Sequence, residues 1–206
     1  MAHAETGERG RGLDRVLAFS DGVFAIAITL LVLNFHVPHL TGRDVNQQLL
    51  DALTREGGLL IGFVISFYVV ARFWVSHHRL SLLLREVDSA FIILNLAFLA
   101  LIVFLPFPTE IIGQYGDTTT AVVFYAGALC ITGTLSWALW EYAFRYRLLD
   151  PAASPQVRRA GAVRALVLVG AFGISIPFAF LDAGAAKFAW LLLLALPLVL
   201  RRVNPG

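Results

Sequence analysis

One carboxylate stands inside a long apolar segment near the start of the chain. Residues 17–35, LAFSDGVFAIAITLLVLNF, are almost continuously hydrophobic, yet they include Ser20, Asp21 and Thr29. An unpaired charge in hydrocarbon is costly, so such a residue is expected to be functional or to be held by a specific partner. Asp21 could therefore fasten this segment to its neighbours, or it could handle protons.

Two further apolar segments offer partners for this carboxylate. Trp74 and His77 in FWVSHHRL are three residues apart and share one face of a helix. Asn95 stands inside the next apolar segment. Indole, imidazole and amide groups can all hydrogen-bond to a hydroxyl or a carboxylate. We expect a polar clasp between helices around Ser20 and Asp21, with a proton-handling or gating role as the alternative.

The sequence carries no motif of an enzyme or of a cofactor site. Walker A, GxGxxG, HExxH, GxSxG and CxxC patterns are all missing, so neither catalysis nor a cofactor is predicted. The adjacent His77 and His78 point about 100° apart on a helix, which favours hydrogen bonding over a structural metal site. No TVGYG filter sequence occurs, and IIGQYG at 111–116 is expected to be a turn in an outer loop.

The composition is that of a polytopic membrane protein. Of 206 residues, 58% are hydrophobic and 15% are charged, whereas soluble domains carry about 25% charged residues. A bilayer core needs about 20 helical residues per crossing. The predicted fold is all-α, with a polar N-terminal tail over 1–16, a C-terminal tail over 201–206 and one domain over 17–200. Its six transmembrane helices are expected at 17–35, 57–76, 89–106, 119–143, 163–181 and 186–200.

The basic residues indicate how this arrangement is oriented. Of the 16 lysines and arginines, 12 fall on one side of the six spans, three fall on the other, and Arg72 lies within the second span. The positive-inside rule then puts both termini in the cytoplasm. The net charge is only +2 and the arginines are scattered among apolar segments, so nucleic-acid binding is not expected. A short interfacial helix is expected over Asp44 to Thr54.

A narrow apolar stripe runs along the first span. At about 100° per residue, Ile26, Leu30 and Leu33 share an arc of about 60°, and Thr29 borders it. Asp21 lies roughly 145° from the centre of the stripe. The carboxylate and the stripe therefore face different surroundings. Periodicity alone is equally typical of a helix that packs against lipid or against a core.

Three motifs resemble the transmembrane protein 175 family of potassium channels. RVLAFSDGVFAIAITLLVL is similar to the first helix of that family and carries its R-x-x-x-F-S-D core at Arg15, Phe19, Ser20 and Asp21. FWVSHHRL and FLPFPTEIIGQYG resemble two further signatures of the family, in the same order. The likeness is specific to the first three spans.

The resemblance implies a prokaryotic potassium-permeable channel, with sodium less favoured, that assembles as a homotetramer in the plasma membrane. It implies a pore lined by the first span, with no re-entrant filter loop. The hydrophobic constriction would fall on Ile26, with further layers at Leu30 and Leu33, and a hydroxyl that favours potassium would fall on Thr29. The F-S-D motif would join the first span to the neighbouring helices.

The main alternative is a proton-coupled membrane carrier in which Asp21 and His77 titrate in turn. Carriers often show internal repeats and interrupted helices. This sequence has no visible repeat, and Gly22 is the only possible break in the first span. A membrane scaffold without transport activity is a third possibility, but the chain carries no recognisable partner domain.

Overall fold

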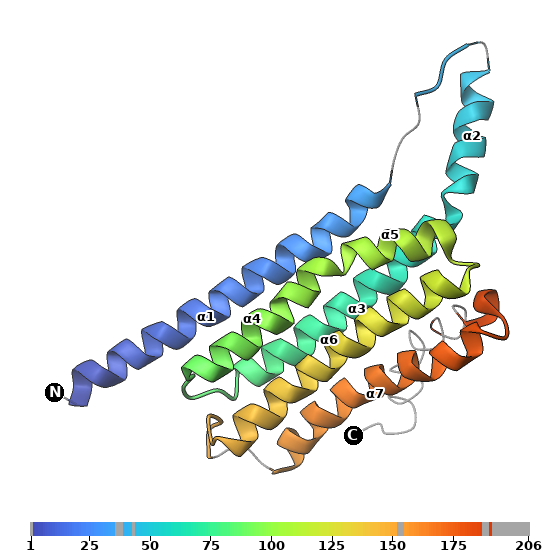
Figure 1. The fold of residues 1–206 in the computed structure, drawn as a ribbon. Helices are drawn as coiled ribbons and strands as arrows, with labels where there is room; N and C mark the ends of the chain where they lie inside the picture. The colour runs from blue at the N-terminus through green and yellow to red at the C-terminus, as the bar shows by residue number, and fades with distance from the viewer. Residues whose placement is uncertain (1, 36–38, 43, 152–154, 187–189, 191–206) are drawn as a thin grey trace, which may run out of the picture.

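The structure, a computed structural model, describes residues 2–35, 39–42, 44–151, 155–186 and 190. Every named element within them is a helix, and the long helices run alongside one another in a bundle (Figure 1). In chain order the elements are α1 (Ala2–Leu30), the 3₁₀ helix η1 (Leu31–Asn34), α2 (Val45–Arg55), α3 (Gly57–Ser81), α4 (Ser89–Phe104), α5 (Pro106–Tyr115), α6 (Thr119–Arg145) and α7 (Pro155–Ala179).

Among the described residues, four helical stretches are long and apolar enough to cross a membrane, and they overlap the first four predicted spans. They cover Gly12–Asn34, Gly57–Ser81, Ser89–Tyr115 and Thr119–Arg145. The fifth predicted span, 163–181, falls on α7, whose apolar part, Ala165–Ala179, is shorter. The sixth, 186–200, lies almost entirely outside the described residues, as does the tail over 201–206. The protein is therefore an all-helical membrane protein.

The polar start of the chain is helical. Helix α1 begins at Ala2, so the residues expected to form a tail over 1–16 continue the first apolar helix. The short helix expected over Asp44 to Thr54 is confirmed as α2. Its Leu49 and Leu53 lie one turn apart and are both exposed, which is typical of a helix at a membrane interface.

The expectation of a turn at IIGQYG was wrong, because residues 111–115 belong to α5. Pro106 and Pro108 lack N–H groups and interrupt the preceding helix at Leu105, but proline is well tolerated in the first turn of a new helix. The Thr109 N–H and hydroxyl both donate to the Leu105 carbonyl, at 3.1 and 2.8 Å. The break in the helix is thus satisfied locally, and α5 begins at once.

Helix α5 stays helical because it packs closely on α3. Gly113 lies against Leu59, and a Cβ added at Gly58 would stand only 2.6 Å from the Gly113 carbonyl oxygen. Small residues allow membrane helices to approach in this way. The segment that looked like a loop in the sequence is therefore a packed part of the bundle.

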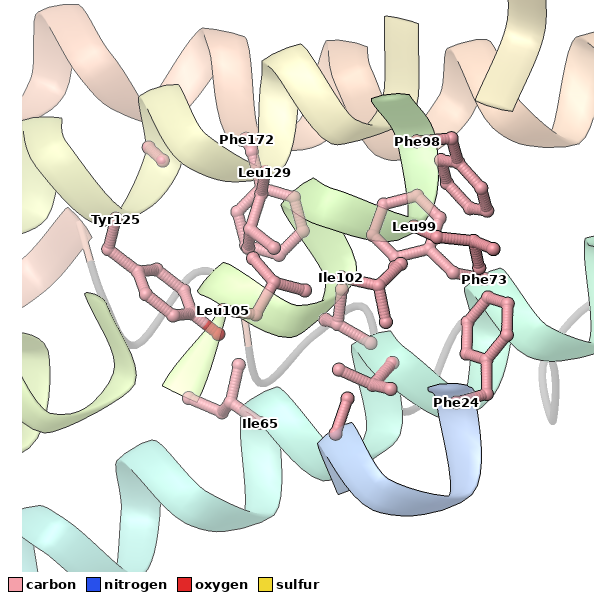
Figure 2. Packing of buried hydrophobic residues seen from close by; sticks show 14 of the residues in the cluster. Phe24, Ile65, Phe73, Phe98, Leu99, Ile102, Leu105, Tyr125, Leu129 and Phe172 are labelled. Carbon is pink, nitrogen blue, oxygen red and sulfur yellow. The ribbon is translucent and has the colours of Figure 1, made fainter. Parts of the chain in front are cut away.

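Aromatic and aliphatic side chains pack together in the core between the helices. Figure 2 shows Phe24 of α1, Phe73 of α3 and Phe98 of α4 at one end of the cluster, with Leu129 and Phe172 of α6 and α7 further along. Burial of apolar area gives little net stabilisation in a lipid environment, so close packing and interhelical hydrogen bonds must hold the bundle together.

The connections at one end of the bundle are joined to each other. The Arg85 N–H donates to the Leu148 carbonyl at 2.9 Å, and the Asp150 N–H donates to the Leu83 carbonyl at 2.8 Å. The links after α3 and after α6 therefore lie together, at the end of the bundle where α1 begins, while α2 and the turn between α5 and α6 lie at the opposite end (Figure 1).

Candidate functional site

Helix α1 has one face buried in its own chain and one face left uncovered. Ser20, Phe24, Ala27 and Leu31 recur every three or four residues and are no more than 2% exposed. The opposite face points away from the bundle, at whose edge α1 lies (Figure 1). For a helix in a membrane protein, such a face must meet lipid, water or another copy of the chain.

Two of the three stripe residues lie on the uncovered face. Ile26 is 60% exposed and Leu33 is 65% exposed, whereas Leu30 is half-buried at the border of this face. Leu33 belongs to η1, in which residues three apart eclipse one another, so it stands in line with Leu30. Val32 lies outside this stripe and is 53% exposed.

The hydroxyl of Thr29 is exposed and has a fixed orientation. Thr29 Oγ1 donates its hydrogen back to the carbonyls of Ala25 and Ile26, at 3.0 and 2.8 Å. A hydroxyl has one hydrogen and two lone pairs. With the hydrogen engaged by the helix, the lone pairs of the exposed oxygen remain available to accept a hydrogen bond.

Three of the expected polar residues form a buried chain of hydrogen bonds. Ser20 Oγ donates to the Val16 carbonyl at 2.8 Å and accepts from Asn95 Nδ2 at 2.9 Å. His77 Nε2 lies 2.9 Å from Asn95 Oδ1. Because this amide oxygen can only accept, His77 must carry a hydrogen on Nε2. Ser20, Asn95 and His77 are each no more than 5% exposed, so this chain ties α1 to α4 and α4 to α3 within the core.

Asp21 takes part in a separate, exposed pair. Trp74 Nε1 donates to Asp21 Oδ1 at 3.0 Å, and the indole stacks on the ring of His78, with centroids 5.3 Å apart. The carboxylate lies beside an open groove of about 400 Å³ between α1 and α3. The expected clasp is therefore two clusters, one buried around Asn95 and one exposed around Asp21.

The remaining members of the expected network lie on the outside of α1. Arg15 and Phe19 are both exposed, and within the described residues no hydrogen bond joins them to either cluster. The two adjacent histidines diverge, since His77 packs between the rings of Phe24 and Phe98 while His78 lies on Trp74. Among the described residues no group of three His, Cys, Asp or Glu side chains could hold a metal ion.

A second set of interhelical contacts, which the sequence did not predict, lies in the half of the bundle away from the clasp. Thr109 Oγ1 lies 2.7 Å from Ser66 Oγ, and Ser66 Oγ lies 2.8 Å from the Tyr125 hydroxyl oxygen, so these three hydroxyl groups join α5, α3 and α6. Asn34 Nδ2 donates to the Pro106 carbonyl at 3.1 Å and fixes the end of η1 to α5. In the sequence, the hydroxyl residues Ser66 and Tyr125 stand inside apolar spans, and this pattern could have indicated that they form interhelical hydrogen bonds.

Comparisons with known proteins agree on one family. A sequence profile described as "Endosomal/lysosomal potassium channel TMEM175" matches residues 15–106, which include the whole of α3 and α4. A potassium channel of Streptomyces collinus is 33% identical over 174 residues, which are 82% of this chain and 83% of that protein. The human endosomal/lysosomal proton channel TMEM175 is 28% identical over 186 residues, which are 90% of this chain but 36% of the human protein.

Solved structures agree with these relatives. The crystal structure of a lysosomal potassium-selective channel TMEM175 homologue from Chamaesiphon minutus matches with a TM-score of 0.77 at 29% identity, over 93% of this chain and 98% of that one. The potassium channel MtTMEM175 shares the fold, with a TM-score of 0.63 at 18% identity and 92% of each chain covered. Because the Streptomyces collinus channel is similar over most of both chains and the Chamaesiphon minutus homologue has the same fold, this protein belongs to the TMEM175 family.

Proposed function

We propose that the protein is a potassium-permeable cation channel in which ions move down their gradient through a pore lined by α1. The uncovered face of α1 supports this proposal. On this membrane-spanning helix, Ile26 and Leu33 are exposed together with the hydroxyl of Thr29, and the rest of the chain leaves them uncovered. Bacterial relatives with the same fold are named potassium channels. The family is one of ion channels, and the protein is not an enzyme.

The pore requires several copies of the chain, and we propose a homotetramer with α1 of each copy next to the axis. Closed rotational symmetry brings the same face of every copy to the centre. Asp21 supports assembly, because its side chain is exposed within the apolar part of α1 and a carboxylate against lipid is costly. A neighbouring copy packed against this side of α1 would remove that cost.

Rings of Ile26 and Leu33 would form a narrow, dry passage, since apolar side chains offer water no hydrogen bonds. Leu30 would contribute from the border of the exposed face. An ion that crosses such a passage sheds part of its hydration, which costs potassium less than sodium because potassium holds water more weakly. The acceptor oxygen of Thr29, next to the Ile26 ring, would replace part of the lost hydration. Potassium preference then needs no re-entrant filter loop.

The proton-coupled carrier is less well supported. It requires proton exchange involving Asp21 and His77, but Asp21 bonds to Trp74 whereas His77 bonds to Asn95. The discontinuous helices of carriers also have no counterpart in α1, which is one uninterrupted helix from Ala2 to Leu30.

Purified protein in liposomes tests the proposal. Vesicles loaded with potassium and diluted into a medium poor in potassium should develop an inside-negative membrane potential that follows the potassium ratio. Because the flux is passive, it should persist without a proton gradient and in the presence of a protonophore. Potassium movement that stops when the proton gradient is removed would favour the carrier, and vesicles made with heat-denatured protein provide the baseline.

We also propose that the chain crosses the plasma membrane of a prokaryote six times, with both termini in the cytoplasm. Cysteine accessibility tests this orientation, after Cys130 has been replaced by alanine. A cysteine at the exposed Asp117 should react with an impermeant maleimide added to intact cells, and one at the exposed Arg85 should react only after lysis. Reaction of both positions in intact cells would contradict the orientation.

A further inference from the structure

A small cavity between α3, α6 and α7 is lined by polar groups that the proposed pore does not use. Arg72, Ser76 and Arg79 recur at intervals of four and three residues, so they share one face of α3. Ser136 of α6 and Ala165 of α7 also line this cavity.

The polar groups around this cavity offer many more hydrogen-bond donors than acceptors. Arginine has no acceptor atom and carries five N–H groups. Ser136 is 3% exposed and forms no hydrogen bond within the described part of the chain. The Ser76 hydroxyl oxygen already accepts from Trp140 Nε1 at 3.2 Å, so its own hydrogen remains to be donated. The cavity is therefore rich in donors and poor in acceptors.

Within the part of the chain that the structure describes, no carboxylate balances the positive charge of the cavity. Neither Arg72 nor Arg79 forms an ion pair with any described residue. Arg72 is half-buried about 13 Å before the end of a membrane-spanning helix, where an uncompensated charge is costly. An anion from outside the chain would compensate it.

We propose that this cavity is a binding site for a phosphate oxyanion, supplied by the headgroup of an anionic phospholipid. Guanidinium groups bind phosphate oxygens through paired, charge-assisted hydrogen bonds, and basic pockets between transmembrane helices bind anionic headgroups. The cavity measures about 10 Å³, room for about one oxygen atom or water molecule. The rest of the phosphate must lie at its mouth, where Arg79 is exposed, and this favours a lipid headgroup over an enclosed free ion.

Thermal unfolding of the purified protein in a neutral detergent tests the site without any measurement of conduction. Phosphatidylglycerol, phosphatidylcholine and inorganic phosphate are added separately at matched concentrations. A ligand that binds only the folded state at about 100 times its Kd should raise the Tm by roughly 5–10 °C. We expect this shift with phosphatidylglycerol and little shift with the other two.

Three variants show whether the shift comes from this cavity. Arg72→Met and Arg79→Gln should each lose at least about half of the shift, while Arg145→Gln, exposed at the end of α6 and outside the cavity, should keep it. Arg72→Met should not lower the Tm without lipid, because it removes an uncompensated charge. An equal shift with inorganic phosphate that the same variants lose would assign the site to the free ion. No shift in the unmodified protein, or equal shifts in all three variants, would overturn the site.

Discussion

Ile26→Asn is expected to increase the cation current and to reduce the preference for potassium over sodium. Ile26 is 60% exposed on the uncovered face of α1, where symmetry would gather one such side chain from each copy. An amide offers hydrogen bonds to water and wets the constriction, so ions keep more of their hydration as they pass. Lowering the barrier by about 1 kcal/mol would raise the current about fivefold. The measurements are single-channel current and reversal potential under bi-ionic conditions.

Val32→Asn is the matched control, because Val32 is 53% exposed on η1, which directly continues α1, but lies off the Ile26 stripe. It should leave both current and reversal potential close to those of the unmodified protein. Thr29→Ala should reduce the potassium preference with a smaller gain in current, since it removes an acceptor oxygen without widening the passage. If Ile26→Asn and Val32→Asn have equal effects, or if Ile26→Asn has none in a conducting protein, α1 does not line the pore as proposed.

Hydropathy predicted most of the described helices because membrane-spanning segments need about 20 apolar residues whatever their neighbours are. It failed where tertiary contacts decide the local structure. FLPFPTEIIGQYG contains two prolines and two glycines, which in isolation are typical of a turn. Whether a new helix starts there depends on the close approach of Gly113 to Leu59 of α3, and that contact joins residues far apart in the sequence.

The candidate site was predictable in residue content but not in pairing. Angular spacing places Asp21 away from Ile26 and Leu33, because a helix fixes the directions of its side chains. Angular spacing could not show how far the neighbouring helices reach around α1. The sequence therefore did not predict that Leu30 is half-buried at the border of the exposed face. Nor could it decide which polar group meets which, since that depends on how far α3 and α4 are rotated about their axes.

The conspicuous carboxylate is therefore not the centre of the buried clasp. Asp21 is exposed and shares one bond with Trp74, whereas Asn95 is 1% exposed and bonds to both Ser20 and His77. Trp74→Phe should accordingly cost little stability, because water or a neighbouring copy can take the place of the indole at Asp21. The larger loss should follow substitution of Asn95.

Asn95→Leu should lower the stability of the folded chain by about 2–3 kcal/mol, or roughly 5–10 °C in Tm. Leucine is similar in size to asparagine but removes the acceptor of the His77 Nε2–H and the donor to Ser20. A buried donor without an acceptor costs about 1–3 kcal/mol, and in lipid water cannot easily replace it. The measurement is thermal unfolding in detergent, with Trp74→Phe as the control.

A double-mutant cycle separates the lost hydrogen bonds from simple repacking. If Asn95 acts through His77, His77→Leu should remove most of the penalty that Asn95→Leu causes, because no unpaired imidazole N–H then remains in the core. The cycle should therefore give a coupling free energy of about 1–2 kcal/mol between the two positions. Independent, additive losses would mean that Asn95 stabilises the bundle through its shape alone. Strong coupling would show that the bond between His77 and Asn95 fastens α3 to α4. Because Ser20 also bonds to Asn95, the position of α1 beside the proposed pore would depend on the same residue.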